Sequence, residues 1–229
     1  MKSSPIYASL VLALLLGAGC HHTNRLAEYD FSGGSLAVQT IIPSRPGVFT
    51  SDFFFYDRRR PLGLFVKLGT ALIKEAEAER ARVRMDSANQ CIDVAAILHD
   101  RIHERSASYL NADPVDAIAD ADFLLDVRIR SYGIDAEAWD AGAYFKIEAE
   151  ALLIDRRGGR LIWETEFEET EPISPLLFGP HSGLRNIITA AALSGLSVEE
   201  MTVALEQLAE FSADRITRRL QRDLYRMRR

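Results

Sequence analysis

Residues 123–130 read FLLDVRIR, residues 145–153 read FKIEAEALL and residues 161–168 read LIWETEFE. In each stretch apolar side chains alternate with charged ones, and a period of two is typical of a β-strand with one buried and one solvated face. Three such stretches in succession predict a sheet with one apolar face. That face needs a cover, which helices elsewhere in the chain can supply.

The segment between the second and third of these stretches favours a tight hairpin. Residues 156–159 read RRGG, and paired glycines accept the positive φ values that short hairpin turns require. We therefore expect the second and third strands to be antiparallel. Two further strands are expected earlier in the chain, at residues 36–42 and at residues 53–56.

Three other regions, at residues 64–84, 92–110 and 198–227, have apolar residues at spacings of three and four, which predicts helices. A break is expected at residues 86–89, between the first two. Residues 184–196 form an apolar run with small residues, which we interpret as a buried or partner-facing helix. The second helix should stop near Pro114, because proline disfavours helical geometry in the residue before it. Ser197 and Glu200 fit a capping box at the start of the last and longest helix. Together these elements predict an α+β fold, a two-layer sandwich in which helices cover a mainly antiparallel sheet.

The first twenty residues have the layout of a signal peptide. One charged residue, Lys2, precedes the apolar run 10–16, and the small residues 17–19 stand directly before Cys20. The run is far shorter than the ~20 residues with which a helix crosses a bilayer. We therefore expect cleavage before Cys20 and acylation of its thiol.

The rest of the chain is predicted to hold a tether and one domain. Residues 20–34 are polar and contain Ser32-Gly33-Gly34, so we interpret them as a lipidated tether. Residues 35–229 are then a single periplasmic domain that ends in an arginine-rich helix. Cys91 would be the one thiol left in the lipidated mature chain, and its apolar neighbours predict a buried position.

Residues 16–20, LGAGC, resemble the bacterial lipobox, although Gly17 stands where that motif usually has leucine. The resemblance implies a lipoprotein whose membrane anchor is a lipid on Cys20. By its similarity to enterobacterial sorting signals, His21 in place of aspartate implies the outer membrane, with the domain facing the periplasm.

A looser resemblance covers about residues 36–170. Residues 121–127, ADFLLDV, and residues 159–163, GRLIW, are similar to the group that includes the penicillin-binding-protein activators, the curli-secretion lipoprotein and the N-terminal domain of the Tol translocation protein. They are also similar to auxiliary lipoproteins of ABC-type lipid transporters. The resemblance implies a small periplasmic α/β domain, and it transfers no functional residue to this chain.

Arginines near the C-terminus are the main candidates for partner binding. Arg215, Arg219, Arg222 and Arg226 step by four, three and four, so they share one side of a helix. Such a side can bind anionic headgroups or an acidic protein surface. The alternative is a solvated flank that pairs with the protein's own acidic strands. The formal net charge of −6 and the predicted export argue against nucleic acid as a partner.

Metal binding and catalysis find little support in the sequence. His99 and His103 stand at i and i+4, a spacing that lets two imidazoles share a metal, but no glutamate lies between them as in His-Glu-x-x-His and no third ligand is placed. The alternative is a pair of surface histidines. We expect no metal, no cofactor and no catalytic residue.

The sequence thus favours a non-catalytic, lipid-anchored adaptor or accessory subunit of an envelope complex. Its expected contact surfaces are the arginine side of the last helix and the proline-rich loop at residues 172–183. One alternative is an auxiliary component of lipid transport that holds an acyl chain in a groove between sheet and helices. Another is an enzyme of unknown type, in which His99, His103 or His181 would meet carboxylates.

Overall fold

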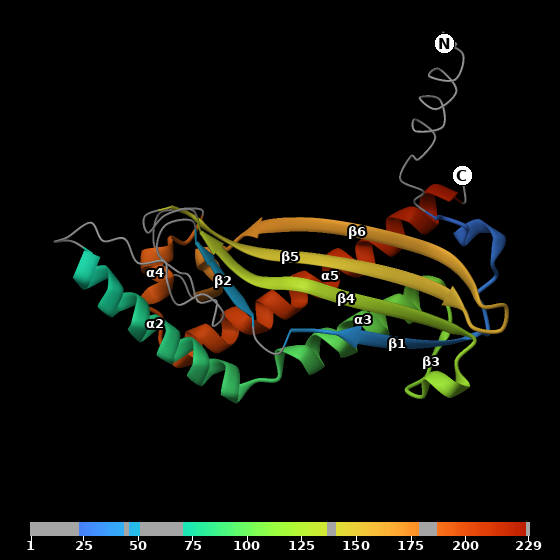
Figure 1. Cartoon of the computed structure of the whole chain (residues 1–229), viewed down its shortest axis with the longest axis horizontal. Helices are drawn as coiled ribbons and strands as arrows, with labels where there is room; N and C mark the ends of the chain where they lie inside the picture. Colours follow the sequence, from blue (N-terminus) through green and yellow to red (C-terminus); the bar gives the residue numbers. More distant parts are fainter. Residues whose placement is uncertain (1–22, 44–45, 51–70, 137–140, 179–186, 228–229) are drawn as a thin grey trace, which may run out of the picture.

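A computed structural model describes residues 23–43, 46–50, 71–136, 141–178 and 187–227. In these ranges helices pack on one face of a sheet (Figure 1), so the fold is α+β. Cys20, His181 and the strand expected at residues 53–56 lie outside the described residues. In chain order the elements are η1 (Leu26–Glu28), β1 (Ser35–Ile41), β2 (Gly47–Thr50), α2 (Ala71–Cys91), α3 (Val94–Leu110), β3 (Asp113–Pro114), η2 (Ile118–Asp120), β4 (Phe123–Ala136), β5 (Ala143–Asp155), β6 (Arg160–Pro172), η3 (Pro175–Phe178), α4 (Ala190–Ser194) and α5 (Val198–Met227).

The three alternating stretches form β4, β5 and β6, and each is longer than its sequence pattern. β5 pairs with both neighbours in antiparallel register, with Ala151 opposite Val127 on β4 and Thr165 on β6. The β5–β6 hairpin is confirmed. Gly159 has a φ of 62° in this turn.

Two short strands, β1 and β2, follow one another along the other edge of β4 and run parallel to it. Parallel neighbours need a long crossover, which α2 and α3 provide here. The register brings Gly47 opposite Gly133. A Cβ atom on Gly133 would overlap the carbonyl oxygen of Gly47, so β2 can approach only a glycine at this position.

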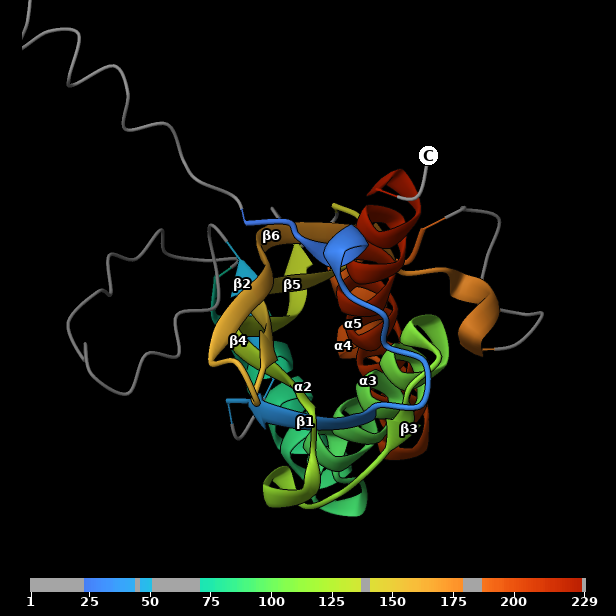
Figure 2. The same ribbon diagram turned by 90° about the vertical axis from the view of Figure 1, so that its right-hand side faces the viewer.

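The helices α3 and α5 lie side by side on the apolar face of the sheet (Figure 2). Strand residues that point toward them include Trp163, Leu153 and Ile147, all fully buried. The helix α5 turns its expected apolar stripe inward, with Met201, Leu205, Leu208, Ile216, Leu220 and Leu224 buried. None of the helices in the described ranges is long and apolar enough to span a membrane.

The break expected at residues 86–89 is wrong. The helix α2 continues through these residues to Cys91, and the chain turns at residues 92–93. Asp93 accepts a hydrogen bond from the backbone N–H of Ala96 at 3.0 Å, so it caps α3 and fixes the boundary. At the other end α3 stops as expected, with Asn111 in the left-handed region at φ 56°.

The helix expected at residues 184–196 is also wrong. Only residues 190–194 of the described part are helical. Before them, Ile188 accepts a backbone hydrogen bond from Ala143 at 2.8 Å and donates one to Ile173 at 3.0 Å. Isoleucine favours extended geometry, and these strand-like bonds prevent the apolar run from forming one helix.

The tether is shorter than expected. Leu26 and Phe31 are each 1% exposed, and Asn24 forms a β-bridge with Trp163 at the edge of β6. Residues 23–34 therefore belong to the domain, because two apolar side chains in this polar stretch enter the core.

Cys91 was expected to be buried and is exposed, since α2 ends at this residue.

Candidate functional site

Two of the four candidate arginines are held by the protein's own sheet. Arg215 and Arg219 both pair with Glu169 near the end of β6, at 3.5 Å and 3.3 Å. Arg215 also bonds Glu171. Their guanidinium groups lie 5.2 Å and 5.4 Å from the ring centres of Phe211 and Phe167. These arginines make the internal pairs that the alternative interpretation predicts, and they stabilise the contact of α5 with β6.

The other two candidates are turned outward. The side chains of Arg222 and Arg226 are 44% and 70% exposed, and they share one carboxylate, Asp223, at 3.8 Å and 4.0 Å. Pairs of this length on an exposed helix stabilise little and leave the guanidinium groups open to other anions. The four arginines therefore differ in environment, two paired to the sheet and two turned toward solvent.

Sequence reasoning missed two members of the exposed side of α5. Arg218 is 62% exposed, one turn before Arg222, and Tyr225 is also 62% exposed. Residues 218, 222, 225 and 226 share one helical side, because they differ by four, three and one positions. We call Arg218, Arg222, Tyr225 and Arg226 the terminal face of α5. The helical spacing between Arg218 and Arg222 could have identified Arg218. No sequence pattern indicates that Tyr225 is exposed.

A buried hydrogen bond connects the last turns of α5 to the sheet. The indole N–H of Trp163 donates to the Asp223 carboxylate at 3.1 Å, and both side chains are buried. Trp163 is the β6 residue that forms the bridge with Asn24. The last turns of α5 and the first described residues consequently lie at the same end of the molecule (Figure 1).

The N-terminal segment is hydrogen-bonded to the edge of β6 from its first described residue. The carbonyl of Thr23 accepts from the N–H of Glu164 at 3.0 Å, and the N–H of Arg25 donates to Ile162 at 2.7 Å. The Arg25 guanidinium donates to Glu28 at 2.9 Å, and this bond holds the pKa of the Glu28 carboxyl below its usual range. The chain therefore joins the edge of the sheet at Thr23, three positions after Cys20.

The two candidate histidines each bond to β1. Nδ1 of His99 lies 3.1 Å from the hydroxyl of Thr40, and Nε2 of His103 lies 3.1 Å from the carbonyl oxygen of Leu36. Their ring centres are 6.0 Å apart. The structure thus uses both rings in the packing of α3 on β1. In the ranges that the structure describes, no three His, Cys, Asp or Glu side chains are grouped as metal ligands.

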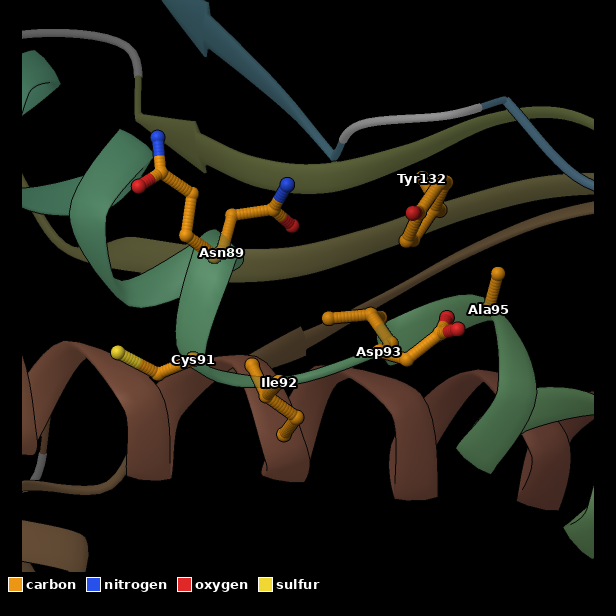
Figure 3. Close-up of a pocket in the computed structure, with 8 residues that line it drawn as sticks. Asn89, Cys91, Ile92, Asp93, Ala95 and Tyr132 are labelled. Atoms are coloured by element: carbon orange, nitrogen blue, oxygen red, sulfur yellow. The ribbon is translucent and has the colours of Figure 1, made fainter.

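A cavity of about 310 Å³ lies at the junction of α2 and α3 (Figure 3). Its lining includes Asn89, Gln90, Asp93 and Tyr132, so it lacks the apolar walls that an acyl chain requires. Burial raises the pKa of Tyr132 to about 12, and its neutral hydroxyl donates to the carbonyl of Pro43 at 3.2 Å. Cys91 also lines the cavity, but no lining residue is a histidine or lysine that could activate its thiol.

The chain matches no known family description and no curated protein. Among solved structures, the PelC dodecamer from Paraburkholderia phytofirmans is 12% identical, covering 76% of this chain and 87% of that chain with a TM-score of 0.31. A DUF330 protein from Xanthomonas campestris is 16% identical, covering 88% and 94% with a TM-score of 0.36. Lipoprotein GNA1162 from Neisseria meningitidis is 19% identical, covering 60% and 83% with a TM-score of 0.23. Scores of this size carry no argument about the function of this chain.

Proposed function

We propose that this chain is a non-catalytic, lipid-anchored accessory protein of the bacterial envelope, held by Cys20 at the periplasmic face of the outer membrane. One observation carries the proposal. The lipobox-like residues 16–20 are followed by only two residues, His21 and His22, before the chain joins the sheet at Thr23. A cysteine so close to a folded domain serves well as an anchor, because the lipid would place the domain directly at the membrane.

The non-catalytic part of the proposal is supported by what the candidate catalytic groups do. His99 and His103 bond to β1. On β5 and β6, Glu148, Glu150 and Glu166 all lie within reach of Arg130, at 3.7 Å, 3.6 Å and closer. Carboxylates that pair with one arginine on an open sheet face suit a solvated, charge-paired surface better than a general acid–base site.

The anchor is tested with Cys20→Ala. We expect the wild-type chain in the outer-membrane fraction and its N-terminal peptide to carry lipid on Cys20 in a mass spectrum. The variant should lose the lipid and leave the outer-membrane fraction. Intact outer-membrane retention of the variant, or a wild-type N-terminal peptide without lipid, would contradict the anchor.

The accessory role is tested by chemical cross-linking in cells, followed by purification of the lipidated protein. We expect one envelope protein to be cross-linked to the wild type in larger amount than to Cys20→Ala, because the anchor places the domain beside its partner. Equal and weak recovery from both forms would argue against an envelope partner that is met at the membrane.

A further inference from the structure

We propose that the terminal face of α5, formed by Arg218, Arg222, Tyr225 and Arg226, rests on the anionic phospholipid surface to which Cys20 is anchored. The proposal rests on the proposed lipid anchor and adds to it an orientation of the domain on the membrane. The ligand chemistry is that of lipid phosphate groups, which guanidinium groups bind through charge and hydrogen bonds.

Chain length places the anchor close to the sheet. Two residues, His21 and His22, separate Cys20 from Thr23. An extended chain advances at most ~3.6 Å per residue, so the three steps from Cys20 to Thr23 span about 11 Å in all. Thr23 is fixed, because its carbonyl accepts the hydrogen bond from Glu164 on β6. The acylated sulfur therefore stays close to this edge of the sheet.

The same edge leads directly to α5. Asn24 bridges Trp163, and Trp163 in turn donates to Asp223, which lies between Arg222 and Arg226 in the sequence. The segment η1 also contacts α5 (Figure 2). A lipid on Cys20 consequently brings the last turns of α5 to the bilayer together with the first residues of the domain.

The terminal face has the chemistry of a membrane-interface surface. It presents three arginines and an exposed tyrosine, and tyrosine is enriched where headgroups meet water. The ion pairs of these arginines involve two carboxylates, Asp214 for Arg218 at 2.8 Å and Asp223 for both Arg222 and Arg226. Three arginines against two carboxylates leave the terminal face with a positive charge.

The whole-molecule charge makes this orientation selective. With a formal net charge of −6, most of the protein surface is repelled by anionic lipid, whereas the terminal face is attracted to it. Each arginine near an anionic bilayer strengthens association about fivefold, so three together favour the docked orientation on the order of 100-fold. Lipid is the occupant favoured over a protein partner, because the anchor already holds lipid within reach.

The experiment uses the full lipidated protein reconstituted into vesicles. A fluorophore is attached to one of two sites. The first is Met227→Cys in a Cys91→Ser background, and the second is the native Cys91. Cys91 ends α2, and the α2–α3 junction lies away from the end of the molecule that holds the first described residues (Figure 1). Lipids with a quenching headgroup report contact with the bilayer. On vesicles that contain phosphatidylglycerol we expect strong quenching at residue 227 and little at residue 91, and on phosphatidylcholine alone we expect quenching at residue 227 to fall severalfold.

Two triple variants with equal net charge provide the control. Arg218→Gln/Arg222→Gln/Arg226→Gln should lose most of the quenching at residue 227. Arg80→Gln/Arg101→Gln/Arg128→Gln, at exposed arginines elsewhere, should retain it. Circular dichroism checks that both variants are folded.

The two proposals fail in different ways. Protein that does not float with vesicles of either composition would contradict the lipid anchor. Protein that floats but shows no quenching at residue 227 would overturn the docked orientation alone. Quenching that is equal in both triple variants, or on both kinds of vesicle, would also overturn it and leave the terminal face open to a protein partner.

Discussion

At the scale of single residues, the hydrogen bond between Trp163 and Asp223 connects the last turns of α5 to β6, beside the first described residues of the chain. Asp223 is the one acidic residue among the last fifteen residues of the chain, and its side chain is turned toward the sheet rather than toward solvent. Its position beside Leu224 on the buried stripe could have indicated burial. Its partner could not be predicted, because Trp163 lies 60 positions earlier and only the tertiary fold brings the two together.

This bond gives a stability prediction. Asp223→Ala should lower the free energy of unfolding by about 1–3 kcal/mol, because it leaves the buried indole N–H without an acceptor. Asp223→Asn should cost less, since an amide oxygen can accept the same hydrogen bond. Denaturant titration measures both. Equal losses in the two variants would mean that the carboxylate's charge matters more than its hydrogen bond.

At the scale of elements, regular periodicity was the most reliable guide. The strands β4, β5 and β6 and the helix α5 follow from alternation and from helical spacing, since the buried residues of each recur at the expected period. No sequence pattern indicates that β1 and β2 pair in parallel with β4, because packing sets the register of strands that a long crossover connects. The region of α4 was mistaken for a longer helix, since a short apolar run does not distinguish the two kinds of structure.

The capping box of α5 gives a second stability prediction. The hydroxyl of Ser197 accepts from the N–H of Glu200 at 3.2 Å, and the Glu200 carboxylate accepts from the N–H of Ser197 at 2.8 Å. Ser197→Ala should destabilise the fold by about 1 kcal/mol, as expected for the loss of an N-cap. The double variant with Glu200→Ala should cost less than the sum of the two single changes, because the bonds support each other. Thermal unfolding of all four proteins measures this, and full additivity would contradict the reciprocal arrangement.

At the scale of the whole molecule, the N-terminal segment bears on the proposed lipid anchor, because it limits how far the domain can move from Cys20. A tether of residues 20–34 would let the domain move far from its anchor, whereas only two residues, His21 and His22, lie between Cys20 and the sheet-bound Thr23. Composition did not indicate that this segment is folded, because Ser32-Gly33-Gly34 is typical of linkers. In the structure it forms a turn into β1, in which the N–H of Gly34 donates to the carbonyl of Phe31 at 3.0 Å. A polar stretch is a linker only if its few apolar side chains remain outside the core.

The same point gives a prediction for the intact domain. Leu26→Ala should lower the free energy of unfolding by about 2–5 kcal/mol, because the removed side chain is buried in the core and leaves a cavity. The matched control is Leu176→Ala. Leu176 is 81% exposed, so its truncation should change stability by no more than about 0.5 kcal/mol. Denaturant unfolding compares the two variants. If Leu26→Ala proved as harmless as its control, residues 23–34 would be a tether after all, and the domain would no longer be held close enough to Cys20 for the terminal face of α5 to meet the lipid surface.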